Sequence, residues 1–382
     1  MSEWKKVKLE EVCKIKSGKR LPKGHDFSSM PTEYKYIRAR DIKNGIINGY
    51  NLVYITKDTH EKISQYIVDT NDIVITIVGA SVGDVAYVTS QFQGMNLTEN
   101  AVRLTDFSSY VDSKYAFYVL NSSEYYDIMQ RIAGGAAQPK LGIYKIEAIE
   151  LSLPPLSTQH RIATILSRYD ALIENYQKQI KLLEEAAQRL YKEWFVDLRF
   201  PGHENTHIVD GVPEGWEKKS VTDLLEIRYG KDHKKLKDGT IPVYGTGGIM
   251  RYVEKELYSG ESVLIPRKGS LNNILLVNDT FWTIDTMFYS VPRLKNVAKI
   301  VYHYLKGNDM YSFNIGAAVP SMTVNILGGM KLSLPEESVR ELFENNIDRY
   351  YHQIKVLSTQ LRLLTEARDR LLPKLMSGEI TV

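Results

Sequence analysis

Apolar residues recur at alternating steps of four and three along two long stretches of the chain, one after Pro155 and one after Pro335. Such spacing lays one narrow apolar seam along a helix, which is typical of a helix that winds around a partner helix. The first predicted seam comprises Ile162, Leu166, Tyr169, Ile173, Tyr176, Ile180, Leu183, Ala187, Leu190 and Trp194. The second comprises Phe343, Ile347, Tyr350, Ile354, Leu357, Leu361, Leu364, Leu371 and Leu375, with Arg368 as its one charged position.

The two predicted helices are separated by one globular segment, so they can pair antiparallel. Each runs roughly 40 residues and would span about 60 Å at 1.5 Å per residue. We expect Ser157 to cap the first helix, because a Ser side chain accepts from the free N–H groups of a first turn. Pro373 should end or kink the last turn of the second helix. The alternative is that each helix packs only on its own globular segment, but such contacts usually show a wider apolar stripe.

The chain also contains an internal repeat. Trp4 and Gly18 recur as Trp216 and Gly230, and the motifs at 135–137 and 151–154 recur at 316–318 and 332–335. The first two landmarks share one offset in residue number, and the last two share a smaller one, so the middle of the second copy is shorter. This arrangement indicates a constant structural frame that carries two different recognition segments. Two copies are too few for a solenoid, which needs three or more stacked repeats.

The segments before the two helices indicate mixed α and β structure. The β-branched run 73–78 predicts a buried strand, with 262–265 as its counterpart. Tight turns are predicted at Asn44-Gly45 and Asp238-Gly239. We therefore predict an α+β fold in which two globular mixed α/β domains, 1–156 and 201–335, are joined by two long antiparallel helices that form a coiled coil. The helices would occupy 157–200 and 336–382, giving the whole chain pseudo-two-fold symmetry.

Composition places the chain among ordinary globular proteins, with 43% hydrophobic and 25% charged residues. The lone Cys13 cannot form an internal disulfide, which favours a reducing, cytoplasmic setting. The first residues lead into no apolar region of a signal peptide, and no run is long enough for a membrane span. The net charge of +3 says little about nucleic acid, because a nearly neutral protein can still carry local basic patches.

The sequence contains none of the catalytic motifs that we sought. It has no phosphate-binding loop of the G-x-x-x-x-G-K-[ST] type, no H-E-x-x-H or Cys/His zinc pattern, and no signature of an amino-methyltransferase. The segment Gly245–Gly248 resembles a dinucleotide loop only superficially and is better explained as a turn. We therefore expect no catalytic residue, no bound cofactor and no metal in this chain.

Basic residues cluster near predicted turns at corresponding places in both copies. Lys and Arg bind phosphate, Arg reads guanine edges, and Gly lets a backbone approach closely. Arg38 and Arg40 would point to one face if they alternate along a strand. A solvated surface explains any single cluster equally well, but recurrence in both copies favours DNA. The candidate DNA-binding residues are Lys16, Lys19, Arg20, Arg38, Arg40, Gln138, Lys140, Arg228, Tyr229, Lys231, Lys234, Lys235, Arg267, Lys268 and Ser321.

Several further motifs cover the full length of the chain. They are the spacing from Trp4 to Leu9, its second copy from Trp216 to Val221 with Val in place of Leu, the segments 192–197 and 212–216, the 151–154 motif before each long helix, and the C-terminal segment 372–379. With these motifs the chain resembles the DNA-specificity subunit of a type I restriction-modification system.

The resemblance implies two target-recognition domains, each reading one half of a split double-stranded DNA target. It also implies a helical spacer that sets the gap and docks two methyltransferase subunits, which restriction subunits with nuclease and translocase activity join. Methylation would occur at adenine N6, with S-adenosylmethionine, ATP and Mg²⁺ bound by the partners and none by this chain. One alternative is a recognition subunit for a fused nuclease-methyltransferase. Another is a coiled-coil assembly protein with adhesin-like domains and no DNA role, although that protein would need a signal peptide.

Overall fold

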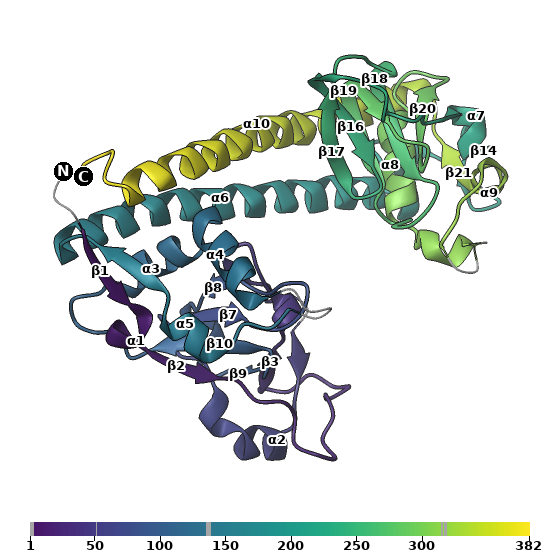
Figure 1. Ribbon diagram of the computed structural model, residues 1–382. Helices are drawn as coiled ribbons and strands as arrows, with labels where there is room; N and C mark the ends of the chain where they lie inside the picture. The colour runs from purple at the N-terminus through teal and green to yellow at the C-terminus, as the bar shows by residue number, and fades with distance from the viewer. Residues whose placement is uncertain (1–3, 51, 135–138, 315, 317–318) are drawn as a thin grey trace. The chain divides into compact units, whose positions relative to one another are not determined.

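The computed structural model describes residues 4–50, 52–134, 139–314, 316 and 319–382 (Figure 1). The chain divides into two compact units: unit 1 is Met1–Asn175 with Leu361–Val382, and unit 2 is Tyr176–Gln360. Each unit combines one globular part with one half of each long helix, α6 (Leu156–Tyr191) and α10 (Glu337–Met376). The fold is α+β, as predicted. Among the described residues, none of the helices combines the length and apolar character needed to cross a membrane.

Unit 1 is built around an antiparallel sheet of order β2-β10-β7-β8, formed by Lys14–Ser17, Ala101–Thr105, Ile73–Thr76 and Val85–Tyr87. Every residue of β7 is buried, as expected of its run of β-branched side chains. The helices α3 (Ser113–Leu120), α4 (Ser123–Ala133) and α5 (Ile143–Glu147) follow the sheet in sequence. Asp112 and Ser122 cap α3 and α4 by accepting from the backbone of Tyr115 and Tyr125.

A second layer of unit 1 is formed mostly by residues between β2 and β7, with β9 (Asn96–Leu97) added from after β8. It contains the sheet β6-β3-β9, formed by Val53–Tyr54, Lys35–Ile37 and Asn96–Leu97. It also contains the hairpin of β4 (Ile42–Lys43) and β5 (Ile46–Ile47), followed by α2 (Lys57–Lys62). The hairpin confirms the predicted turn, because Asn44 and Gly45 connect its strands with φ of 54° and 82°.

Unit 2 contains a larger sheet of order β15-β20-β18-β19-β16-β17. Its strands are Leu225–Tyr229, Met287–Pro292, Tyr258–Pro266, Leu275–Thr283, Asp238–Gly245 and Gly248–Val253. The helices α8 (Ala298–Lys306) and α9 (Val324–Gly329) follow, and η6 (Met310–Phe313) is a single 3₁₀ turn between them. A short antiparallel pair, β12 (Ile208–Val209) with β13 (Val212–Pro213), lies before all of these strands in the sequence.

Two predictions about turns in unit 2 had different outcomes. The segment Gly245–Gly248 is the turn of the β16–β17 hairpin, as expected. The prediction for Asp238-Gly239 was wrong, because both residues lie within β16, beside an irregularity in its pairing with β17. A Cβ on Gly239 would lie 2.4 Å from the carbonyl oxygen of Val253, so this glycine permits a close strand crossing rather than a turn.

The internal repeat is the same pair of strands built twice. In unit 1, β1 (Lys5–Lys8) pairs with β11 (Glu150–Leu153), and Lys5 lies opposite Leu153. In unit 2, β14 (Glu217–Ser220) pairs with β21 (Lys331–Leu334), and Glu217 lies opposite Leu334. The two registers correspond position by position at the two offsets of the sequence repeat. The short helices α1 (Leu9–Val12) and α7 (Val221–Leu224) then lead into β2 and β15 in the same way.

Each unit pairs one half of α6 with the opposite half of α10. In unit 1, Ile162 and Leu166 share a core with Leu375, while in unit 2 Ala187 shares a core with Phe343. The helices are therefore antiparallel, and every predicted seam position is buried or half-buried. The alternative in which each helix packs only on its own globular segment is wrong, since α6 contributes to both cores.

The start of α6 differs from the expectation, whereas Pro373 does lie in the last turn of α10. Ser157 is not the N-cap, because α6 already begins at Leu156. The carbonyl of Pro155 accepts from Thr158, and the Gln159 side chain donates to the carbonyl of Pro154, so these contacts organise the first turn. Pro373 lies inside α10, which continues to Met376. Because proline has no N–H, the last turn lacks the hydrogen bond that residue 373 would otherwise donate to the carbonyl of Asp369.

Candidate nucleic-acid interface

Four segments of unit 1 meet beyond the ends of β2 and β7. Lys19 N donates to the carbonyl of Leu97 at 2.8 Å, and Ile77 N donates to that of Asn100 at 2.8 Å. Gly79 N donates to the carbonyl of Pro139 at 3.2 Å, beside a β-bridge between Val78 and Lys140. We call this set of segments, 18–20, 77–79, 97–100 and 139–140, the strand-end cluster of unit 1.

Unit 2 has an equivalent strand-end cluster, formed by 230–231, 267–269, 283–286 and 320–321. Lys231 N donates to the carbonyl of Thr283 at 2.8 Å, and Gly269 N donates to that of Pro320 at 2.9 Å. Lys268 forms a β-bridge with Ser321, the counterpart of the bridge between Val78 and Lys140. The sequence motifs did not predict that these segments converge, because the convergence depends on hydrogen bonds between segments far apart in the chain.

A glycine makes the close approach possible in each cluster. A Cβ on Gly18 would lie 2.0 Å from the carbonyl oxygen of Thr98, and one on Gly230 would lie 2.0 Å from that of Ile284. No side chain fits at such a distance, so both positions require glycine for space rather than for backbone conformation. The repeated glycines of the sequence therefore mark the same junction in both units.

Three predicted residues of unit 1 belong to its strand-end cluster. Lys19 Nζ lies 5.6 Å from the centre of the Tyr66 ring, and Arg20 Nε lies 3.3 Å from a carboxylate oxygen of Glu99. Lys140 is exposed. Gln138 lies outside the described residues.

Lys16 points away from the cluster. Its ammonium group lies 3.6 Å from Asp106, and that of Lys14 lies 3.1 Å from the same carboxylate. Hydrogen bonding from Lys14, followed by its charge, lowers the pKa of Asp106. Lys14 lies opposite Thr105, so Asp106 is at the end of β2 that is far from Gly18.

The expectation that Arg38 and Arg40 alternate along a strand was wrong. The strand β3 ends at Ile37, and 39–41 form a 3₁₀ turn rather than a continuing strand. Asp41 causes the turn, because its side chain accepts from Arg38 N at 2.9 Å and from Arg38 Nε and Nη2 at 2.8 Å each. Asp41 is only 4% exposed, so the pair is a structural contact, while Arg40 is exposed.

Arg38 and Arg40 nevertheless line one cavity with Asp41 and Asn48. Its volume is about 400 Å³. We call it the arginine pocket. The backbone N–H of Thr98 donates to the carbonyl of Ile37 at 3.0 Å, so the pocket adjoins the strand-end cluster of unit 1.

In unit 2 the structure brings Tyr229 and Arg267 together. The Arg267 guanidinium lies 5.5 Å from the centre of the Tyr229 ring, and its Nη1 donates to the carbonyl of Asp285 at 2.9 Å. Tyr229 is 55% exposed, so its aromatic ring is accessible to a binding partner. Lys268 is exposed beside them, and Ser321 is held by a hydrogen bond from its backbone N–H to Asn314 Oδ1 at 2.8 Å.

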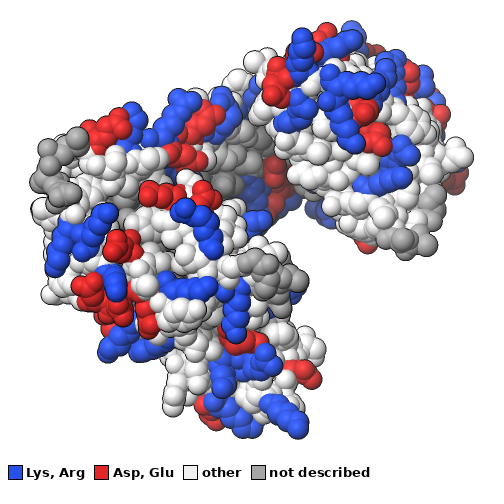
Figure 2. Space-filling view, viewed as in Figure 1, with Lys and Arg blue, Asp and Glu red and all other residues white. Residues whose placement is uncertain are grey.

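The remaining basic residues of unit 2 differ in their partners. Arg228 donates to both carboxylate oxygens of Glu226, at 2.8 and 3.0 Å. Lys231, Lys234 and Lys235 are exposed, and within the described part of the chain no carboxylate lies within ion-pair distance of their ammonium groups. Figure 2 shows basic side chains interspersed with acidic ones on the visible face of each unit, so positive charge is concentrated only locally.

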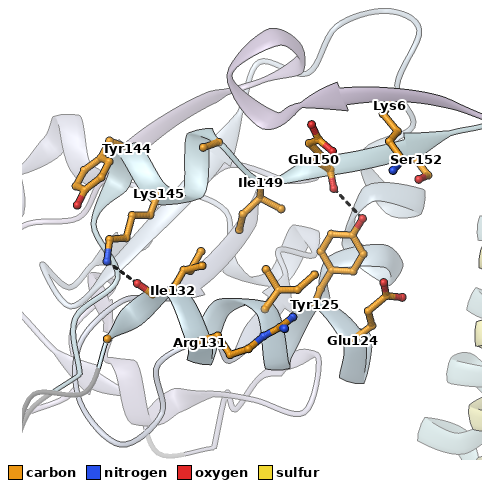
Figure 3. Close-up of a pocket in the computed structure, with 13 residues that line it drawn as sticks. Lys6, Glu124, Tyr125, Arg131, Ile132, Tyr144, Lys145, Ile149, Glu150 and Ser152 are labelled. Atoms are coloured by element: carbon orange, nitrogen blue, oxygen red, sulfur yellow. Dashed lines mark hydrogen bonds between the residues drawn. The ribbon is translucent and has the colours of Figure 1, made fainter.

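An open groove of about 850 Å³ lies in unit 1 between α4, α5 and β11 (Figure 3). Tyr125 donates from its hydroxyl to the carbonyl of Glu150 at 2.8 Å, and Lys145 Nζ donates to that of Ile132 at 2.5 Å. These contacts tie the three elements together. Of the predicted DNA-binding residues that the structure describes, none lines the groove. Among the residues that the structure describes, no group of three or more His, Cys, Asp or Glu side chains could hold a metal ion.

Comparison with known proteins assigns the family. The profile of the type I restriction modification DNA specificity domain matches residues 1–185 and 213–347. The chain is 25% identical over 311 residues, 71% of its length, to the type I restriction enzyme MjaIX specificity subunit of Methanocaldococcus jannaschii, of which 70% is covered. It is 24% identical over its whole length to the MjaVIII specificity subunit of the same organism, of which 93% is covered.

A solved structure agrees with the fold. The S subunit of a type I restriction-modification system from M. genitalium superposes with a TM-score of 0.62 at 19% identity, over 97% of this chain and 96% of that one. The matched profile covers most of both units, including the strand pairs that form the repeated frame. The chain therefore belongs to the family of type I restriction-modification DNA-specificity proteins.

Proposed function

We propose that this chain is the DNA-reading subunit of a type I restriction-modification complex and carries out no catalysis itself. Residues 1–156 read one half of a bipartite double-stranded target, and residues 201–335 read the other half. Two adenine-N6 methyltransferase subunits dock on the chain, and restriction subunits with nuclease and translocase activity join them. S-adenosylmethionine, ATP and Mg²⁺ are bound by these partners.

The equivalent strand-end clusters are the observation that carries this proposal. Each combines a glycine junction with exposed basic side chains, namely Lys19 and Lys140 in unit 1 and Lys231 and Lys268 in unit 2. Lys neutralises phosphates, and segments that lack bulky side chains can come close to a DNA backbone. Two such surfaces on one chain are what a target with two separate blocks requires.

The long helices support a spacer role for 157–200 and 336–382. α6 is continuous from Leu156 to Tyr191 and contributes to both cores, and α10 does the same in the opposite direction. Because each helix belongs to both units, its length constrains the gap between the two blocks that are read.

A map of methylated adenines tests the proposal. The full chain is expressed with its methyltransferase in a host that lacks other adenine methyltransferases. We expect N6-methyladenine within a motif of two short blocks separated by an unspecified gap, and no methylation when this chain is omitted. Methylation that does not depend on the chain, or a motif without a gap, would contradict the proposal. Methyl transfer by the purified chain alone would contradict its non-catalytic role.

A further inference from the structure

The two units share a frame but differ in what they insert into it. In unit 1 the insertion runs from Gly18 to Ile75, the residue of β7 opposite Val102. In unit 2 the corresponding interval, from Gly230 to Ile265, is much shorter, and Ile265 is the residue of β18 opposite Phe288. This one interval therefore accounts for most of the length by which the second copy is shorter.

The inserted segments have different structures. In unit 1 the interval forms β3, the 39–41 turn, the β4–β5 hairpin and α2, whereas in unit 2 it forms the β16–β17 hairpin. Contacts to phosphate position a protein on DNA without carrying sequence information, while contacts to base edges specify the sequence. Features common to both units suit the first task, and features unique to one unit suit the second.

The arginine pocket lies entirely within the inserted segment of unit 1. We infer that this pocket recognises a guanine in the half-site read by unit 1, whereas the strand-end clusters hold the DNA backbone in both units. The inference rests on the proposed function and extends it to the base that one site reads.

The polar groups of the pocket favour an acceptor-rich base edge. Asp41 already accepts three hydrogen bonds from Arg38. Asn48 Oδ1 accepts from the backbone of Tyr50 at 3.0 Å, which leaves the amide nitrogen of Asn48 as a donor toward the pocket. Arg40 is exposed and lines the pocket. Guanine presents two acceptors, O6 and N7, in the major groove, and Arg is their usual partner.

The backbone around the pocket is supported by a buried core of unit 1. Ile42 and Ile47, the paired residues at the base of the β4–β5 hairpin, are buried in a core with Ile37, Val74 and Ala86. The backbone N–H of Asn48 donates to the carbonyl of Asp41 at 2.7 Å, which fixes the two sides of the pocket. These contacts fix the backbone that carries Arg40 and Asn48, which limits where their side chains can reach and favours discrimination.

The test uses the full chain with its methyltransferase and compares motifs from maps of methylated adenines. The variants are Arg40→Ala, Arg40→Lys and Asn48→Ala. Lys43→Ala is the matched control, because Lys43 is an exposed cation on the same hairpin but does not line the pocket. The block read by unit 2 serves as an internal control for folding and assembly.

We expect Arg40→Ala to relax a guanine position in one block by roughly 5- to 150-fold, the worth of one bidentate contact. The other block and the gap stay unchanged. Arg40→Lys relaxes the same position, since a single ammonium cannot form the two parallel bonds. Asn48→Ala weakens that position or its neighbour, and Lys43→Ala leaves the motif as it is.

Two results would overturn the inference. One is an unchanged motif in Arg40→Ala and Asn48→Ala. The other is a uniform loss of methylation in Arg40→Ala that Arg40→Lys restores with the original motif, which would assign Arg40 to phosphate. If Arg40→Ala abolishes all methylation, the motif of Arg40→Lys decides the role of Arg40. A relaxed guanine position supports base recognition, and the original motif assigns Arg40 to phosphate. The absence of any two-block motif with the unmodified chain would instead contradict the proposed function.

Discussion

The guanidinium of Arg368, the only charged position in either predicted seam, donates from Nη1 to Oδ1 of Asp170 on the opposite helix at 2.9 Å. The other carboxylate oxygen of Asp170 accepts from the hydroxyl of Tyr118 on α3 at 2.6 Å. Burial, and after it the hydrogen bond to Asp170, raises the pKa of that hydroxyl. One carboxylate thus joins both long helices to the globular part of unit 1, which explains why a charge is tolerated in an apolar seam.

Replacing Arg368 with an apolar residue should therefore destabilise unit 1, although Arg368 is the one charged position of an apolar seam. Arg368→Leu leaves Asp170 partly buried without its cation, and we expect a loss of about 1–3 kcal/mol in the free energy of unfolding of unit 1. The double variant Arg368→Leu/Asp170→Asn should recover part of this loss, because Asn can still accept from Tyr118. Urea unfolding of the four proteins of this cycle measures the coupling. Additive effects of the two changes would show that the contact contributes nothing.

In unit 2 a buried histidine of α8 contacts both long helices. His303 is 2% exposed, its Nδ1 bonds Gln188 Oε1 at 2.7 Å, and its Nε2 accepts from Tyr351 at 2.9 Å. Burial, and after it the positive charges of Lys299 and Lys306, lowers the pKa of His303 to about 3. Since the unfolded chain binds this proton near pH 6.5, the stability that neutral His303 contributes is present above that pH and is lost as the pH falls toward 3.

We therefore expect the urea midpoint of unit 2 to fall between pH 7 and pH 4.5, with part of the fall due to His303. His303→Gln keeps hydrogen-bonding capacity without titrating in this range, so its midpoint should depend less on pH. The comparison is made with the same full-length chain at constant ionic strength. Identical pH dependence in the two proteins would contradict the assignment.

The repeated glycine junction can be tested in unit 2. Gly230→Ala places a methyl group 2.0 Å from a backbone oxygen, so β15 or the segment 283–286 must move. We expect a loss of about 1–3 kcal/mol, the usual cost of overpacking. Gly247→Ala is the control, because it has no neighbour within 4 Å and no positive φ. Equal unfolding midpoints for the two variants would show that the junction does not need glycine.

The unpaired lysines of unit 2 should contribute to DNA affinity without reading sequence. Replacing Lys231, Lys234 and Lys235 with Ala should weaken binding to all sequences and reduce the salt slope by up to about one unit per lost phosphate contact. Arg228→Ala should change the slope less, because Glu226 already neutralises that side chain. Binding of the assembled complex is measured across a salt series. An unchanged slope in the triple variant would make the cluster an ordinary solvated surface.

The frame of the fold could be predicted from sequence because its signals are local. The seam from Ile162 to Trp194 and the offsets of Gly18 and Leu151 each depend on residues read in order, and the structure agrees with them. The candidate interface could be predicted only in part, because hydrogen bonds over long sequence separations form it. No spacing rule links Gly79 to Pro139 or Gly269 to Pro320. The strand prediction at Arg38 was wrong for a related reason. Alternation predicted a strand, but the side chain of Asp41 accepts from Arg38 N and a turn forms instead.

We propose that the two long helices set the distance between two blocks of DNA sequence. Insertion of one heptad after Gln179 and one after Gln360 preserves both seams, because these positions correspond at the same offset as the 151–154 and 332–335 motifs. Both insertions lie close to the limits of the two units, away from Leu166 and Ala187 in the cores.

Each heptad lengthens a helix by about 10 Å, or about three base pairs at 3.4 Å each. Three heptads add about nine base pairs, which nearly restores the rotational phase of a turn of about 10 base pairs.

The decisive measurement is therefore the map of methylated adenines for chains with one and three added heptads in each helix, each expressed with the methyltransferase. We expect both blocks to keep their sequences while the gap grows, most clearly by about nine base pairs with three heptads, where the rotational phase is nearly restored. Block sequences that change while the gap stays constant would contradict it.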